Sequence, residues 1–105
     1  METSVRMALS GKQVRQLRSL ANNLKTTIQV GKEGVTDNIV KQVESNLEAH
    51  ELVKVGMLCD SGEEAAELGR EIAERTGADM VQVIGKRVVL YRETSRDDVK
   101  KIELA

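Results

Sequence analysis

Two glycines three residues apart, Gly31 and Gly34, lie in the sequence GKEG between an alternating apolar run and the expected start of a helix. Glycine has no side chain, so a nucleic-acid backbone can come close to such a loop. The free amides and the dipole at the beginning of a helix favour an anion, and Lys32 adds a positive charge. Together these are the features of a GxxG loop that holds RNA phosphates. A simple surface turn is the alternative, and the negative charge of Glu33 favours it.

Residues suited to metal binding or covalent catalysis are scarce. His50 is the one histidine and Cys59 the one cysteine, and neither has neighbours at zinc-ligand spacing. We interpret both as structural residues, and Ser10 and Ser61 as helix caps. No glycine pattern matches a Walker loop or a dinucleotide fingerprint. We therefore expect no catalytic residue, no metal ligand and no cofactor; a hydrolase or transferase built around His50 is the weakest alternative.

The composition indicates one soluble domain. A chain of 105 residues can build one core but not two. Phe and Trp are absent and Tyr91 is the only aromatic residue, so stacking of bases on aromatic rings is almost excluded. A single cysteine cannot form an internal disulfide, which fits a reducing compartment. No segment is apolar enough for a signal peptide or a membrane span, so we expect a cytoplasmic protein with no membrane partner.

The formal net charge of -1 hides a separation of charge along the chain. Residues 1–32 carry six basic residues against one acid, a net of +5. Residues 60–79 carry seven acids against two arginines, a net of -5, and residues 80–92 return to +3. If the two basic segments meet in space, the molecule has a positive and a negative face, which favours a polyanionic partner. Ordinary solvated helix faces are the alternative.

The first expected element is an amphipathic helix over Leu9 to Leu24. Ser10 and Gln13 have the spacing of a capping box at its start. Apolar residues recur at three- and four-residue spacing on its inward side, and basic residues follow its outward side. The inward set is Val14, Leu17, Leu20, Ala21 and Leu24, and the outward set is Lys12, Arg15 and Arg18.

The rest of the chain alternates between strand and helix patterns. We expect strands over 26–30, with Ile28 and Val30 on one face, and over 51–59. Helices follow Thr36 and Ser61, and the second of these ends at Gly77. Strands over 80–84 and 87–91 form a hairpin around Gly85 and Lys86, which suit a type II′ turn. This α-β-α-β-α-β-β order predicts an α/β fold with helices packed on a mixed four-stranded sheet.

Three blocks of the sequence match a known family in the right order: VGKEGVT at 30–36, EAHELVKV at 48–55 and VQVIGKRVVLYR at 81–92. They resemble the CRM module, named for chloroplast RNA splicing and ribosome maturation, in its stand-alone bacterial YhbY-like form. The resemblance implies one RNA-binding domain over 9–92, with a fold similar to the C-terminal domain of bacterial translation initiation factor three. A flexible N-terminus (1–8) precedes it, and a tail (93–105), either a short helix or disordered, follows.

Bacterial members of this family associate with precursors of the large ribosomal subunit, so the resemblance implies a monomeric RNA-binding protein whose partner is large-subunit ribosomal RNA or its precursor particle. With few aromatic residues, it should read the shape of structured RNA. The candidate RNA-binding residues are Gly31, Lys32, Glu33, Gly34, Lys12, Arg15, Arg18, Lys25, Lys54, Lys86 and Arg87. The alternative is a protein-interaction module of a ribosome-associated complex that acts through acidic residues of the third helix, Glu63, Glu64, Glu67, Glu71 and Glu74.

Overall fold

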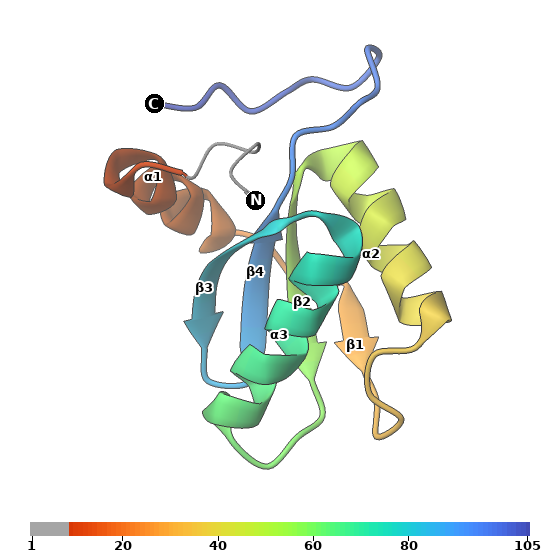
Figure 1. Ribbon diagram of the computed structural model, residues 1–105. Coiled ribbons are helices and arrows are strands. Elements are labelled where there is room, and N and C mark those ends of the chain that lie inside the picture. Colours follow the sequence, from red (N-terminus) through yellow and green to blue (C-terminus); the bar gives the residue numbers. More distant parts are fainter. Residues whose placement is uncertain (1–8) are drawn as a thin grey trace.

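A computed structural model describes residues 9–105. Within them, three helices and four strands follow each other in the expected order (Figure 1). The predicted α/β fold with a mixed four-stranded sheet is confirmed. The elements are α1 (Gly11–Ala21), β1 (Ile28–Val30), α2 (Asp37–His50), β2 (Leu52–Met57), α3 (Gly62–Thr76), β3 (Asp79–Ile84) and β4 (Arg87–Tyr91).

The strands lie in the order β1-β2-β4-β3. β1 and β2 are parallel and are connected by α2, whereas β4 is antiparallel to both β2 and β3. The carboxyl ends of β1, β2 and β3 therefore lie at one edge of the sheet, at the bottom of Figure 1. We call this edge, with its loops 31–35, 58–61 and 85–86, the loop edge.

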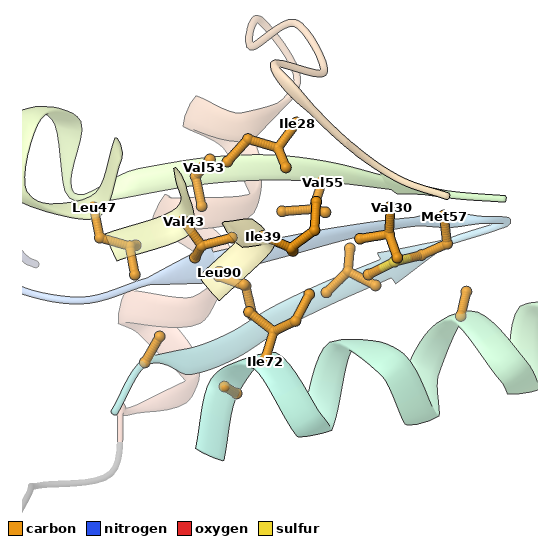
Figure 2. Close-up of a cluster of buried hydrophobic side chains, with 14 residues drawn as sticks. Ile28, Val30, Ile39, Val43, Leu47, Val53, Val55, Met57, Ile72 and Leu90 are labelled. Carbon is orange, nitrogen blue, oxygen red and sulfur yellow. The ribbon is translucent and has the colours of Figure 1, made fainter. Parts of the chain in front are cut away.

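The main hydrophobic core lies between one face of the sheet and the helices α2 and α3 (Figure 2). Side chains alternate between the two faces of each strand, so every second residue of a strand contributes to this core. Val53, Val55 and Met57 of β2 point into this core. The buried members are Ile28, Val30, Ile39, Val43, Leu47, Val53, Val55, Met57, Ala65, Ile72, Ala73, Ala78, Val88 and Leu90.

A second, smaller cluster lies on the other face of the sheet, beneath α1. Its buried members are Leu17, Ala21, Leu52, Val81, Val89 and Tyr91. The prediction that Leu20 faces inward is wrong, because its side chain is 43% exposed. A narrow stripe through Leu17 and Ala21, four residues apart, makes the buried contact, and Leu20 lies outside it.

The helix starts follow the local signals in the sequence. Ser10 and Gln13 form the complete capping box at α1. The Thr36 hydroxyl accepts a hydrogen bond from the Ile39 amide at 3.2 Å, and Ser61 caps α3 in the same way. Because these bonds join residues three apart, sequence spacing alone was enough to predict them.

The ends of several elements are shorter than the sequence predicted. α1 ends at Ala21 instead of Leu24, β1 begins at Ile28 instead of Thr26, and β2 covers Leu52–Met57 instead of 51–59. Gly77 ends α3 in the left-handed conformation, as expected, with φ of 72°. Gly85 in the β3–β4 turn has φ of 57°, which agrees with the glycine position of a type II′ turn.

The tail after β4 is held by a buried carboxylate. Glu51, which follows α2, has an exposed fraction of 0%. Its two oxygens accept hydrogen bonds from the backbone amides of Thr94 at 2.7 Å and Ile102 at 2.6 Å. Residues 93–105, expected as a short helix or disordered, contain no helix and run across the end of the sheet toward α1 (Figure 1). Ile102 and Leu104 pack against the second cluster.

Glu51→Ala should lower the free energy of unfolding by about 2 to 4 kcal/mol, because the buried amide of Thr94 and the half-buried amide of Ile102 lose their acceptor. The backbone is not relieved, since Ala tolerates the positive φ of 66° no better than Glu does. Urea unfolding measures the change, with Glu67→Ala on the exposed side of α3 as the control, expected to stay within about 0.5 kcal/mol. Equal midpoints for the two variants would show that the tail contributes no stability.

Candidate nucleic-acid interface

The GKEG sequence forms a tight turn at the loop edge. The amide of Gly34 donates a hydrogen bond to the carbonyl of Gly31 at 3.0 Å, so Lys32 and Glu33 occupy the corner. Both corner side chains are exposed. Gly34 has φ of 78°, a conformation that favours glycine.

Gly31 has no such conformational reason to be glycine. Its φ is not positive, and a Cβ atom placed there would meet only Glu33 Oε1, at an ordinary distance of 3.8 Å. The space outside Gly34 is also open, with no atom within 4 Å of such a Cβ. Both glycines therefore expose bare backbone to solvent, which is the geometry that a closely approaching phosphate backbone needs.

An arginine from α3 holds the far end of this loop. Arg75 donates one hydrogen bond to the carbonyl of Val35 at 3.2 Å and another to the carboxylate of Asp37 at 2.6 Å. Asp37 lies in the first turn of α2, so the contact joins the loop, α2 and α3. Sequence reasoning missed Arg75 because about 40 residues separate it from the loop and no local pattern marks the contact.

The β3–β4 turn lies near the GKEG loop at the same edge. The amide of Met57 donates to the carbonyl of Lys86 at 2.8 Å, and the amide of Leu58 donates to the carbonyl of Val30 at 2.9 Å. Since Val30 directly precedes Gly31, the Lys86 turn and the GKEG loop lie on either side of the end of β2.

Within the part of the chain that the structure describes, the first basic segment (residues 9–32) meets the second (80–92). Arg18 of α1 donates from Nε to the carbonyl of Val81 in β3 at 3.3 Å. Arg87 and Lys54 lie on the same face of the sheet as α1, because Lys54 pairs with Val89 of the second cluster and Arg87 pairs with Gly56 in the same β2–β4 ladder.

The predicted basic residues do not form a single patch. Lys32, Lys86 and Arg87 gather at the loop edge, with Lys54 behind them on the sheet. Lys25 and Lys54 line a separate cavity of about 410 Å³. Lys12 and Arg15 lie at the start of α1, where the neighbouring Gln13 and Gln16 hold the tail through Ala105 and Glu103.

The ion pairs within residues 9–105 leave out the candidate basic residues, as they also leave out Lys41, Arg70 and Lys100. Arg75, Arg92, Arg96 and Lys101 each form an ion pair with an acid of α2, α3 or the tail. Within residues 9–105, the eight candidates form none: Lys12, Arg15, Arg18, Lys25, Lys32, Lys54, Lys86 and Arg87. Their charges are available to an external anion.

Most of the acids near the sheet lie on the side that α2 and α3 cover, while Glu33 and Asp60 lie in the loops of the loop edge. The five glutamates of α3, Glu63, Glu64, Glu67, Glu71 and Glu74, are exposed on the side of the sheet opposite α1. Glu48 of α2 accepts a hydrogen bond from the Ser95 hydroxyl, and this bond, with Arg92 nearby, lowers the pKa of Glu48. The negative charge is thus partly neutralised, but Glu33 and Asp60 lie in the loops of the loop edge, and Glu63 and Glu64 follow in the first turn of α3.

Tyr91 packs in the second cluster and is only 6% exposed. Burial, followed by the nearby Glu51 carboxylate, raises the pKa of its hydroxyl to about 12. The ring is therefore not available for stacking with a base. Across residues 9–105 we find no group of three or more His, Cys, Asp or Glu side chains placed to hold a metal, and none of the helices described there is long and apolar enough to cross a membrane.

Comparisons with known proteins bear on the family and on the fold. The profile of the CRS1 / YhbY (CRM) domain matches residues 9–92. Probable RNA-binding protein YqeI of Bacillus subtilis (strain 168) is 43% identical over 96 residues, which cover 91% of this chain and 98% of YqeI. RNA-binding protein of Haemophilus influenzae is 33% identical over 92 residues, or 88% of this chain and 93% of its own. The solution structure of hypothetical protein SAV1595 from Staphylococcus aureus superposes with a TM-score of 0.80 at 43% identity, covering 93% of this chain and all of that one (100%).

The two glycines of the loop should differ in their effect on stability. Gly31→Ala should leave the free energy of unfolding unchanged or raise it by up to about 1 kcal/mol, because the site accepts a Cβ and the unfolded chain loses freedom. Gly34→Ala should lower it by about 1 to 2 kcal/mol, since its φ is positive. Urea unfolding of both variants measures this difference. Equal losses for the two variants would contradict the loop geometry.

Proposed function

This chain belongs to the CRS1 / YhbY (CRM) domain family, and we propose that it is a non-enzymatic RNA-binding protein that docks on structured ribosomal RNA during assembly of the large ribosomal subunit. Its relatives in Bacillus subtilis and Haemophilus influenzae are named as RNA-binding proteins. The ribosomal target comes from the resemblance to this family, because bacterial members of the family associate with precursors of the large subunit.

The observation that carries the proposal is the open backbone at Gly31. The fold itself would accept a side chain there, so the glycine is better explained by a molecule that comes close from outside. The loop leads into the start of α2, where amides and the helix dipole favour an anion. We propose that an RNA phosphate lies against the amides of Lys32, Glu33 and Val35, with the Lys32 side chain beside it, because the Gly34 amide already donates to Gly31.

Basic residues without ion pairs also support an approach of RNA to the loop edge. Lys86 and Arg87 lie at the same edge as the loop and form no ion pair with a described residue. Basic side chains without acidic partners provide the charge that releases counterions from RNA. We further propose that the protein acts as a cytoplasmic monomer, with a single RNA-binding domain over residues 9–92.

The acidic helix α3 supports a second candidate function, a protein-interaction module that contacts a basic protein of a ribosome-associated complex. Its glutamates lie on the face of the sheet opposite α1, and α3 begins directly after the 58–61 loop of the loop edge. The two functions can therefore be separated by mutation. Charge reversal in α3 would abolish binding to a protein partner, and substitutions at Gly31 and Gly34 would not.

Gly31→Asp/Gly34→Asp should weaken binding to fragments of large-subunit ribosomal RNA at least about tenfold, because two carboxylates replace a phosphate-binding surface.

Lys86→Ala/Arg87→Ala should instead reduce the slope of log affinity against log salt by about 0.7 to 0.9 for each phosphate that is no longer neutralised. Fluorescence anisotropy across a salt series measures both quantities, after circular dichroism has shown that each variant is folded.

Gln42→Asp/Ser45→Asp is the matched control, since it adds the same charge at exposed positions of α2 outside the loop. It should bind nearly as well as the wild type. If the loop variant also binds like the wild type, GKEG is only a turn. If the wild type binds no RNA fragment at any salt concentration, the protein-interaction function becomes the better explanation.

A further inference from the structure

A row of residues across the sheet remains uncovered next to the GKEG loop. The strand register aligns Gln29 of β1 with Gly56 of β2, Gly56 with Arg87 of β4, and Arg87 with Ile84 of β3. Cross-strand partners share a face of the sheet, and this face is the one that α1 packs on. The row lies at the loop edge, beyond the part of the sheet that α1 covers, because the second cluster extends only as far as Val89 along β4.

This uncovered row forms the floor of an open hollow. Its volume is about 460 Å³, and it is lined by Gln29, Gly56, Ile84, Lys86 and Arg87 among others. That volume is within the roughly 300–1,000 Å³ range of small-ligand sites. The Ile84 side chain is 44% exposed, so an apolar surface adjoins two cationic side chains that form no ion pair with a described residue.

The side chain of Gln29 lies across Gly56. A Cβ atom at Gly56 would be 2.7 Å from Gln29 Oε1 and 3.2 Å from Gln29 Cδ, so a side chain at position 56 would displace the amide. Gly56 is buried under this contact, whereas Gln29 is exposed. The Gln29 amide makes no hydrogen bond with any other part of the chain described by the structure. Its donor and its acceptor are both available to a ligand.

We propose that this hollow binds one unpaired RNA nucleotide and that Gln29 reads its base. An amide presents a donor and an acceptor side by side, which matches N6 and N7 of adenine. Ile84 supplies an apolar contact for the base, and Lys86 and Arg87 neutralise the flanking phosphates. Adenine is therefore the preferred base, and Gly56 is a positioning residue that keeps the amide in place.

The inference deepens the proposed function and rests on it, because the nucleotide would belong to the same RNA whose backbone contacts the GKEG loop. Val30 alone separates Gln29 from Gly31 along the chain. A strand held at the loop edge by its phosphates would therefore present its adjacent base to Gln29. Single-stranded RNA allows such splayed bases to be read by their edges.

The test compares ten-nucleotide oligo(A), oligo(U) and oligo(C) by fluorescence anisotropy at low salt. The wild type should bind oligo(A) about tenfold more tightly than the other two. Gln29→Ala should remove this preference while keeping the weaker binding common to all three. Gly56→Ala should have the same effect through displacement of the amide, and Gln42→Ala, an exposed glutamine on α2, should keep the preference.

A second measurement observes the amide directly. In NMR spectra the side-chain NH₂ signals of Gln29 should shift on addition of oligo(A), and those of Gln42 should not. The proposal is overturned if the wild type shows no preference for oligo(A), or if Gln29→Ala keeps that preference unchanged. Absence of wild-type binding to all three oligonucleotides and to ribosomal RNA fragments overturns the proposed function together with it.

Discussion

The antiparallel ladder between β2 and β4 is the constraint on which the rest of the structure depends. It aligns Leu52 with Tyr91 at one end and Gly56 with Arg87 at the other. Because side chains alternate along a strand, a shift of one residue in this register would turn one strand over relative to the other. If β4 shifted, Arg87 would face the main core, and Val88 and Leu90 would leave it. The position of every candidate contact on the α1 side of the sheet follows from this register.

The same ladder divides the molecule into two sides of opposite charge. Helices α2 and α3 cover one side, where acids are either exposed, as in α3, or held by Arg75 and Arg92. Helix α1 covers only part of the other side and leaves the loop edge open. A small core without Phe or Trp thus leaves part of a sheet face bare, and that bare area lies beside the GKEG loop. The proposed phosphate contact and the proposed base contact both use this geometry.

A buried glutamate holds the end of the chain in place. Glu51 joins the end of α2, the start of β2 and the tail through hydrogen bonds to Thr94 and Ile102. Its positive φ of 66° makes it the one non-glycine residue within 9–105 in that conformation. A glycine would be the ordinary choice there, so the carboxylate outweighs the backbone preference. The tail then covers the second cluster through Ile102 and Leu104.

The sequence by itself determined the parts of this protein that depend on neighbours in the chain. These parts arise from interactions over a few residues, so residue spacing was sufficient to predict them. They are the helix caps at Ser10, Thr36 and Ser61, the turn at Gly85, and the shared face of Ile28 and Val30. The GKEG loop was also placed between a strand and a helix in this way. Only the tertiary structure decided which distant residues meet. It placed β4 between β2 and β3, and it brought Arg75 to Asp37 and Glu51 to the tail. It also left Leu20 exposed and laid Gln29 over Gly56. Each of these features depends on segments far apart in the sequence. No local pattern encodes these contacts, because they arise when the whole chain buries its apolar surface at once.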